Sequence, residues 1–161
     1  MLENKKVLIT GGTGSLGSAL TERLLKTGVD AIRIYSRDEL KQTQMETKFN
    51  DKRLRFLIGD IRDKARLEKA VEDINIVIHT AALKQVPVIE YNPFEAIKTN
   101  VQGAQNLVDA CLAKDVEFAL AIGTDKAVSP FNTYGATKLL MERLFVSDKK
   151  NSVNEQISKQ L

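Results

Sequence analysis

Two residues able to transfer protons, Tyr134 and Lys138, stand four positions apart in a segment, 132–145, that is expected to be helical. Residues at this spacing share one face of a helix. A free tyrosine ionises near pH ~10 and is a poor base at neutral pH, whereas a neighbouring ammonium favours the phenolate. The pair is therefore a candidate for proton transfer, although the same spacing also arises by chance on solvated helices.

Three polar residues that precede this helix strengthen the candidate. Thr124, Asp125 and Lys126 directly follow a short apolar run that has the character of a buried parallel strand. In an open parallel sheet, the ligand crevice lies at the carboxyl ends of the strands. We therefore expect these three side chains to join Tyr134 and Lys138 as the catalytic group.

A glycine-rich turn, GGTGSLG at residues 11–17, follows the apolar run 7–10 and opens an amphipathic segment that ends at Gly28. Its spacing fits both G-x-G-x-x-G and G-x-x-G-x-x-G. Glycines allow the backbone to approach a pyrophosphate, whose charge then lies at the N-terminus of the helix. The turn predicts a dinucleotide site that includes Gly11, Thr13, Gly14, Ser15 and Leu16.

The end of the second predicted strand, 31–36, bears on which dinucleotide binds. An aspartate or glutamate there would bind the ribose 2′-hydroxyl of NAD, but this chain has Ser36 and Arg37. A guanidinium with a nearby hydroxyl suits a 2′-phosphate, so the sequence favours NADP over NAD. Lys41, one helical turn further, either assists or is an ordinary surface charge.

Further cofactor contacts are expected at the ends of the third and fourth strands. Asp60 would accept from the adenine amino group, while Asp63 has the position of a helix N-cap. The small residues after the fourth strand would lie along the nicotinamide ribose. The predicted cofactor contacts from these segments and the later helices are Asp60, Ile61, Ala81, Ala82, Leu83, Lys84, Asn100, Tyr134 and Lys138.

Three other residues have competing interpretations. Asn100, inside a helix predicted at 93–113, either fixes the catalytic loop or a water molecule, or is simply exposed. His79, the single histidine, lies in a buried strand and is interpreted as a packing residue. Cys111, the single cysteine, is interpreted as a small core residue. No residues have metal-ligand spacing, so no metal site is predicted.

The composition narrows the class of protein. A chain of 161 residues suits one domain, and its net charge of +3 comes without a block of basic residues, which argues against a nucleic-acid partner. A single cysteine fits a reducing compartment. No apolar run approaches the ~20 residues of a membrane span, and the N-terminus lacks a signal-peptide pattern. We expect a cytoplasmic protein.

Five apolar runs alternate with helical segments, which predicts an α/β domain of the Rossmann type. Right-handed crossovers would give a parallel sheet of order 3-2-1-4-5, ending before the last strands of a complete doubly wound sheet. Residues 87–93, with two prolines and an asparagine, are predicted to form a loop on the substrate side. The domain covers residues 1–147, and the polar tail 148–161 is either a marginal helix or disordered. An open sheet edge predicts self-association into a homo-oligomer.

The chain resembles the extended short-chain dehydrogenase/reductases, and among them the inverting UDP-N-acetylglucosamine 4,6-dehydratases of bacterial nonulosonate and capsule biosynthesis. The most specific motif is TDKA at 124–127, ahead of YGATK at 134–138, because TDK replaces the Ser-Ser of epimerases. The other matching segments are residues 10–15, 35–41, 49–50, 55–56, 59–60, 82–87, 90–93 and 98–100. The resemblance extends from residue 5 to about residue 147.

The resemblance implies a complete mechanism. Tyr134, activated by Lys138, takes the proton of the sugar O4 while NADP accepts the C4 hydride, and Thr124 holds the 4-oxygen. The 4-ketone acidifies C5–H, so Lys126 removes that proton, Asp125 protonates the departing C6 hydroxyl and water leaves. Hydride return to C6 and protonation of C5 from the opposite face complete the inversion. The implied substrate is UDP-N-acetylglucosamine or a related UDP-sugar.

The chain departs from this family in two respects. Gln85 stands where many of these dehydratases have histidine, which leaves the sugar open. Such enzymes are also about twice as long, and the half without a counterpart here carries the sugar-nucleotide domain. The alternatives are a UDP-sugar 4-epimerase or reductase on the same scaffold, and a non-catalytic NADP-binding module.

Overall fold

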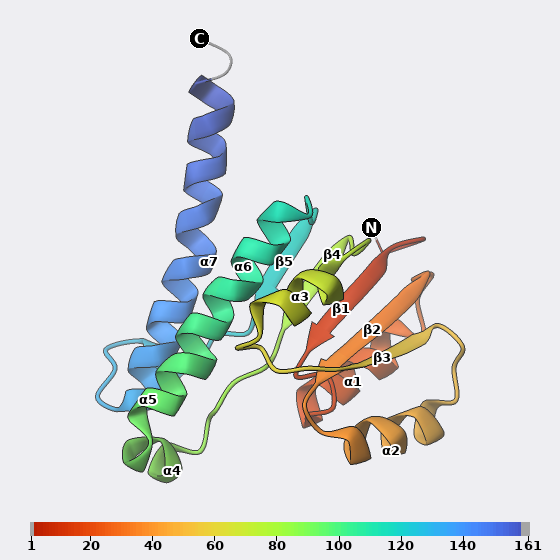
Figure 1. The fold of residues 1–161 in the computed structure, drawn as a ribbon, viewed down its shortest axis with the longest axis horizontal. Helices are drawn as coiled ribbons and strands as arrows, with labels where there is room; N and C mark the ends of the chain where they lie inside the picture. The colour runs from red at the N-terminus through yellow and green to blue at the C-terminus, as the bar shows by residue number, and fades with distance from the viewer. Residues whose placement is uncertain (1, 159–161) are drawn as a thin grey trace.

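The computed structural model describes the backbone of residues 2–158 and the side chains of residues 2–147. Its centre is a five-stranded parallel sheet of order β3-β2-β1-β4-β5, as the sequence predicted (Figure 1). Each strand coincides with one of the apolar runs, which suit strands that are covered on both faces. The strands are β1 (Lys6–Thr10), β2 (Ala31–Ser36), β3 (Leu54–Ile58), β4 (Ile76–His79) and β5 (Phe118–Ala121).

The helices connect successive strands and cover the two faces of the sheet. In chain order they are α1 (Ser15–Leu24), α2 (Glu39–Phe49), α3 (Lys64–Val71), α4 (Val86–Tyr91), α5 (Pro93–Ala96), the π-helix η1 (Ile97–Gln102), α6 (Gly103–Ala113), the 3₁₀ helix η2 (Asp125–Ala127) and α7 (Thr133–Ser158). The helix predicted at 93–113 is thus α5, η1 and α6 in succession. Helix α7 extends beyond the body of the domain (Figure 1).

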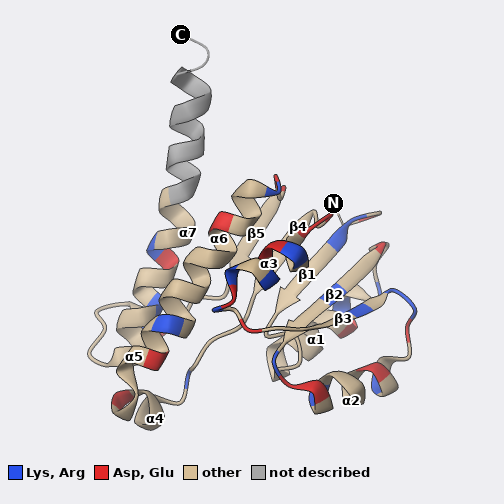
Figure 2. Cartoon of the chain, in the orientation of Figure 1, with Lys and Arg blue, Asp and Glu red and all other residues tan. Residues whose placement is uncertain are grey.

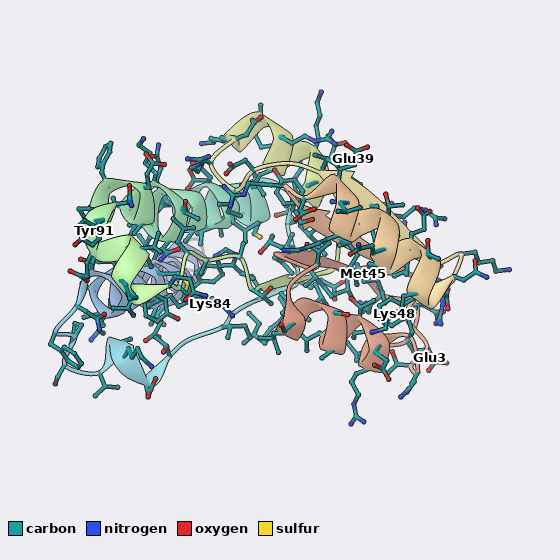
Figure 3. All side chains as sticks on the ribbon, turned by 90° about the horizontal axis from the view of Figure 1, so that it is seen from below. Glu3, Glu39, Met45, Lys48, Lys84 and Tyr91 are labelled. Carbon is teal, nitrogen blue, oxygen red and sulfur yellow. The ribbon has the colours of Figure 1, made fainter. Side chains whose placement is uncertain are left out.

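Alternating side chains of the strands build two separate cores. On one face, Val7 and Ile9 of β1 pack with residues of α1 and α2, among them Met45, which points from α2 toward the sheet (Figure 3). On the other face, Leu8 of β1 packs with residues of α3, α6 and α7, including the predicted core residue Cys111. The fold is therefore a three-layer sandwich of helices, sheet and helices.

The parallel register brings the carboxyl ends of the strands together. Thr10 at the end of β1 pairs with Tyr35 of β2 and with His79 of β4, and His79 pairs with Ala121 at the end of β5. The glycine turn, the Ser36 segment, the segment after β4 and the loop that contains η2 consequently start from one edge of the sheet.

Three sequence predictions about local structure are wrong. Strand β5 is not buried, because it lies at the edge of the sheet, and Phe118 and Leu120 are 56% and 43% exposed. Residues 86–91 form helix α4 rather than a loop, since Pro87 lies in its first turn, where a missing N–H costs nothing. Helix α1 ends at Leu24, four residues before Gly28.

Charges of both signs are distributed over the helices and loops in the view of Figure 2. In the part of the chain that the structure describes, none of the helices has the length and hydrophobicity that a membrane crossing requires.

Candidate active site

A cavity of about 680 Å³ lies at the carboxyl edge of the sheet. It brings together most of the residues predicted to contact a cofactor, namely Gly11, Thr13, Gly14, Ser15, Leu16, Ser36, Arg37, Lys41, Asp60, Ile61, Ala81, Ala82, Leu83 and Lys84. The three other predicted contacts, Asn100, Tyr134 and Lys138, are not in its lining. Six lining residues were not named as contacts in the sequence: Gly17, Tyr35, Asp38, Gly59, Thr80 and Thr99. All of these but Thr99 are sequence neighbours of predicted residues at the first turn or at strand ends. This adjacency could have identified them as cavity residues.

The glycine turn packs too closely for side chains at Gly11, Gly12 and Gly17, and a Cβ atom on Gly12 would lie 2.8 Å from the side chain of Ile34. Gly11 has φ +67°, and a Cβ atom there would lie 2.7 Å from the backbone nitrogen of Ala81. A Cβ atom on Gly17 would lie 2.5 Å from Gly12. At Gly14 the nearest atom is the carbonyl oxygen of Gly11 at 3.2 Å, so its missing side chain leaves space toward the cavity.

The N-terminus of α1 differs from those of the next two helices. Asp38 caps α2 and Asp63 caps α3, each accepting from a backbone N–H of the first turn, so the predicted N-cap at Asp63 is confirmed. Helix α1 has Gly14 at its N-cap, with no side-chain hydrogen bond and no acidic residue in its first turn. Its first N–H groups and the positive end of its dipole therefore face the cavity, an arrangement that fits the diphosphate of a dinucleotide.

The far end of the cavity is lined by side chains with cationic and hydroxyl donors. Arg37 and Lys41 are 58% and 62% exposed. Two carboxylates lie beside them, but each is engaged. Asp38 accepts from the Lys41 backbone N–H at 3.0 Å, and this hydrogen bond is the main cause of its lowered pKa. Asp60 accepts from Arg62 at 2.7 Å, which lowers its pKa, and lies 3.6 Å from Arg37.

Tyr134 and Lys138 both lie in α7, one helical turn apart, as predicted. Lys138 is only 4% exposed and donates to the main-chain oxygen of Ile122 at 2.6 Å. Burial lowers the pKa of its ammonium, although Glu142 nearby acts in the opposite direction. Tyr134 is half-buried, so its side chain is partly open to solvent, whereas Lys138 is buried.

The segment Thr124–Lys126 forms a small polar cluster on η2. The Thr124 hydroxyl donates to Asp125 at 3.0 Å, and the Lys126 ammonium lies 3.5 Å from the same carboxylate oxygen. The Thr124 bond, followed by the charge of Lys126, lowers the pKa of Asp125. The side chains of Asp125 and Lys126 are open to solvent, at 88% and 47% exposure respectively.

Asn100 joins the cavity to the helix that carries Tyr134. It lies in the π-helix η1 and is fully buried, so its interpretation as an exposed residue is wrong. Its side chain accepts from Leu83 N–H at 2.8 Å and donates to the Leu83 carbonyl at 2.9 Å and to Thr137 at 3.1 Å. Thr137 in turn donates to the Tyr134 carbonyl at 2.9 Å. This network fixes the cavity wall relative to α7.

His79 is a buried packing residue, as predicted. Its Nδ1 lies 2.7 Å from the Thr10 hydroxyl and its ring stacks on Phe145 at 5.8 Å between centroids. Its Nε2 is buried and has no partner among the described residues. Burial, together with the nearby charge of Lys138, lowers the pKa of the imidazole to about 3. Cys111 is buried in the core, which raises the pKa of its thiol to about 12.

A family model described as "Polysaccharide biosynthesis protein" matches residues 7–160 of this chain. The chain belongs to this family. The match agrees with the resemblance to short-chain dehydrogenase/reductases drawn from the sequence motifs.

Two curated relatives carry different activities in their names. Over 157 residues, or 97% of the chain, it is 52% identical to a Campylobacter jejuni UDP-N-acetylglucosamine 4,6-dehydratase (inverting), and covers 47% of that protein. Over 151 residues, or 91% of the chain, it is 45% identical to a Rickettsia rickettsii UDP-glucose 4-epimerase, and covers 44% of it. The chain thus spans less than half the length of these relatives.

A solved structure of an enzyme in complex with NAD has the same fold. The UDP-glucuronic acid 4-epimerase of Bacillus cereus in complex with NAD superposes with a TM-score of 0.78 at 26% identity. The superposition covers 91% of this chain and 53% of the epimerase. The names of the two curated relatives and of this structure all contain a UDP-sugar, and the name of the structure also contains NAD.

Proposed function

We propose that this chain is the NADP-binding part of a C5-inverting UDP-N-acetylglucosamine 4,6-dehydratase, a lyase of bacterial polysaccharide or nonulosonate biosynthesis. The observation that carries the proposal is a cavity with an uncapped helix N-terminus at the carboxyl edge of the sheet, the edge from which the segment that carries Thr124–Lys126 and leads into the helix of Tyr134 and Lys138 also starts. The 52% identity to a named dehydratase supports the same activity.

The cavity fits a dinucleotide in each of its parts. The first turn of α1 would bind the diphosphate, the Ser36 segment the adenosine ribose, and Ala81 to Lys84 the nicotinamide side. When bound, the nicotinamide supplies hydride acceptance from C4 and hydride return to C6. The role of the chain is to orient the cofactor and the sugar and to move protons.

Tyr134 would remove the O4 proton, with Lys138 as its electrostatic support. The burial of Lys138 suits this role, because a charge in a poorly solvated site acts more strongly on its neighbours. The hydrogen bond to Ile122 holds the ammonium while Tyr134 changes its protonation state. Thr124 would hold the 4-oxygen by its hydroxyl.

Lys126 would take the C5 proton and Asp125 would protonate the departing C6 hydroxyl. These roles require a neutral lysine and a protonated carboxyl group, whereas the exposed pair in the free chain is charged. Removing water from around a charged pair favours the neutral form of both groups. A UDP-sugar that covers this pair, together with the second half of the enzyme, would therefore prepare it for the elimination.

The choice of NADP over NAD rests on Ser36, Arg37 and Lys41. These side chains offer hydrogen-bond donors and positive charge at the ribose end of the cavity. The carboxylates beside them already accept hydrogen bonds, Asp38 from the Lys41 backbone N–H and Asp60 from Arg62. A 2′-phosphate would find partners there, whereas a 2′-hydroxyl would lack the free carboxylate that NAD sites provide.

A UDP-sugar 4-epimerase is the second candidate, favoured by the 45% identity to a named epimerase. Epimerisation needs no abstraction at C5, so Lys126 distinguishes the two reactions. In a longer form that carries the second half of the enzyme, Lys126→Ala should stop loss of water while leaving oxidation at C4 intact. Equal loss of both steps would contradict the role given to Lys126.

The direct test is incubation of that longer form with UDP-N-acetylglucosamine and detection of the product by mass spectrometry and NMR. A 4-keto-6-deoxy product with inverted C5 supports the dehydratase. Conversion to the C4 epimer without loss of water would establish the epimerase instead, and binding of NADPH without turnover would indicate a non-catalytic module.

We further propose that the protein acts in the cytoplasm as a homo-oligomer. The exposed apolar side chains of the edge strand β5 and of α4 and α5 support self-association, among them Phe118, Leu120, Tyr91 and Phe94. Sedimentation velocity over a range of concentrations tests this, and a monomer at all concentrations would contradict it.

A further inference from the structure

Gln42 of α2 is a buried polar residue that no step above uses. It is 5% exposed and lies one turn before Met45, so the two residues share the buried face of α2. Its side-chain nitrogen lies 3.1 Å from the Ser36 carbonyl oxygen, 3.0 Å from the Ser36 hydroxyl and 2.9 Å from the Leu57 carbonyl oxygen. It thus ties the end of β2, where Ser36 faces the cavity, to β3.

The partners of this amide settle its orientation. The main-chain oxygens of Ser36 and Leu57 can only accept hydrogen bonds, so the NH₂ group of Gln42 must face them. Rotating the amide by half a turn would set its oxygen against two carbonyl oxygens. The NH₂ group has two hydrogens for three acceptors, so the hydrogen that faces Ser36 is shared between its carbonyl oxygen and its hydroxyl, and the hydroxyl accepts.

This geometry determines what Ser36 can offer to a ligand. A hydroxyl that accepts from Gln42 keeps its own proton for a different partner. The cavity-lining cations beside it, Arg37 and Lys41, are donors and cannot take that proton. The nearby carboxylates of Asp38 and Asp60 accept from Lys41 and Arg62, and among the described residues neither accepts a hydrogen bond from the Ser36 hydroxyl. The Ser36 proton is thus available to an acceptor that enters the cavity.

We propose that Gln42 is a positioning residue for cofactor specificity: it holds the Ser36 hydroxyl as a hydrogen-bond donor toward a phosphate on the ribose 2′-oxygen. The inference rests on the proposed use of NADP and adds a residue that touches no cofactor itself. A phosphate oxygen accepts only, so a pre-oriented donor favours it over a hydroxyl, which can adapt to either role.

Calorimetric titration with adenosine 2′,5′-bisphosphate and with 5′-AMP isolates this part of the cavity, because the two probes differ only in the 2′-phosphate. Ser36→Ala and Gln42→Met should each weaken binding of the bisphosphate by about 10-fold, which is the effect of one hydrogen bond to a charged group. Each should change the affinity for 5′-AMP by less than about 2-fold. The double variant should be no weaker than either single one. Gln44→Met, the same change at an exposed position of α2, is the matched control.

The outcomes separate the inference from the proposed function. If the unaltered chain binds both probes equally, the proposed NADP preference fails and the inference fails with it. If the bisphosphate is preferred but Gln42→Met behaves like Gln44→Met, or Gln42→Met weakens both probes alike, only the inference is overturned. Should Gln42→Met not fold, the Ser36→Ala result decides alone, and an unchanged affinity for the bisphosphate would overturn the proposal.

Discussion

The ammonium nitrogen of Lys138 lies 2.6 Å from the main-chain oxygen of Ile122, so the helix that carries Tyr134 is fastened to the end of β5. This contact holds a buried lysine with a lowered pKa one helical turn from Tyr134. The position of the proposed proton-transfer pair therefore depends on a contact between α7 and the segment after β5, as well as on the spacing of its residues along the helix.

Replacing Lys138 by methionine should preserve the fold and remove catalysis. Methionine fills the same buried space without a charge, so turnover of the longer form should fall at least about 100-fold, the usual contribution of a proton-transfer group. Lys48→Met, at an exposed position of α2 (Figure 3), is the control and should leave turnover unchanged. Steady-state rates with UDP-N-acetylglucosamine measure this, and full activity of Lys138→Met would exclude the proposed role.

Asn100→Ala should destabilise the domain by about 2–3 kcal/mol, because it leaves the main-chain N–H and carbonyl of Leu83 without this partner and removes the bond to Thr137. Denaturant unfolding followed by circular dichroism gives the difference. Asn92→Ala removes one exposed hydrogen bond to Val88 and should cost less than about 0.5 kcal/mol. Similar losses in the two variants would show that the Asn100 network does not support the fold.

Stability should fall as the pH is lowered from 6.5 to 5, because of His79. In the folded chain its pKa is about 3, while an exposed histidine titrates near 6.5. The unfolded chain therefore binds a proton in this interval that the folded chain does not bind, which lowers the unfolding free energy by roughly 1–2 kcal/mol. His79 is the single histidine, so His79→Phe should flatten this part of the profile. An equally steep profile in the variant would assign the effect to other groups.

Two glycines of the first turn should separate folding from binding. Gly17→Ala sets a methyl group 2.5 Å from Gly12 and should lower the unfolding free energy by more than about 2 kcal/mol. Gly14→Ala meets one oxygen at 3.2 Å and should cost less than about 1 kcal/mol, yet its methyl group would project where the diphosphate approaches α1. Thermal unfolding and NADPH fluorescence titration distinguish them. Tight NADPH binding by Gly14→Ala would place the diphosphate elsewhere.

The sheet order and the helix N-cap at Asp63 were predictable because they depend on local patterns. Five apolar runs separated by helical segments allow few right-handed arrangements, and an aspartate ahead of a helical run is a common cap. The cavity lining was largely predictable for the same reason, since it consists of the residues that end successive parallel strands.

Features that depend on distant contacts were not predictable. The burial of Asn100 depends on Thr137, which lies 37 positions away in the chain, and on a π-helical turn that has no recognisable sequence pattern. The exposure of Phe118 and Leu120 follows from the position of β5 at the sheet edge, although their sequence is that of a buried strand. Pro87 was interpreted as a loop residue because proline is common both in loops and at helix N-termini.

A crystal of the chain soaked with NADP⁺ tests the central claim most directly. The account predicts density for the diphosphate against the first turn of α1, for the 2′-phosphate beside Ser36 and Arg37, and for the nicotinamide on the side of Tyr134. An empty cavity at saturating NADP⁺, or a dinucleotide whose diphosphate lies away from Gly14, would contradict the account.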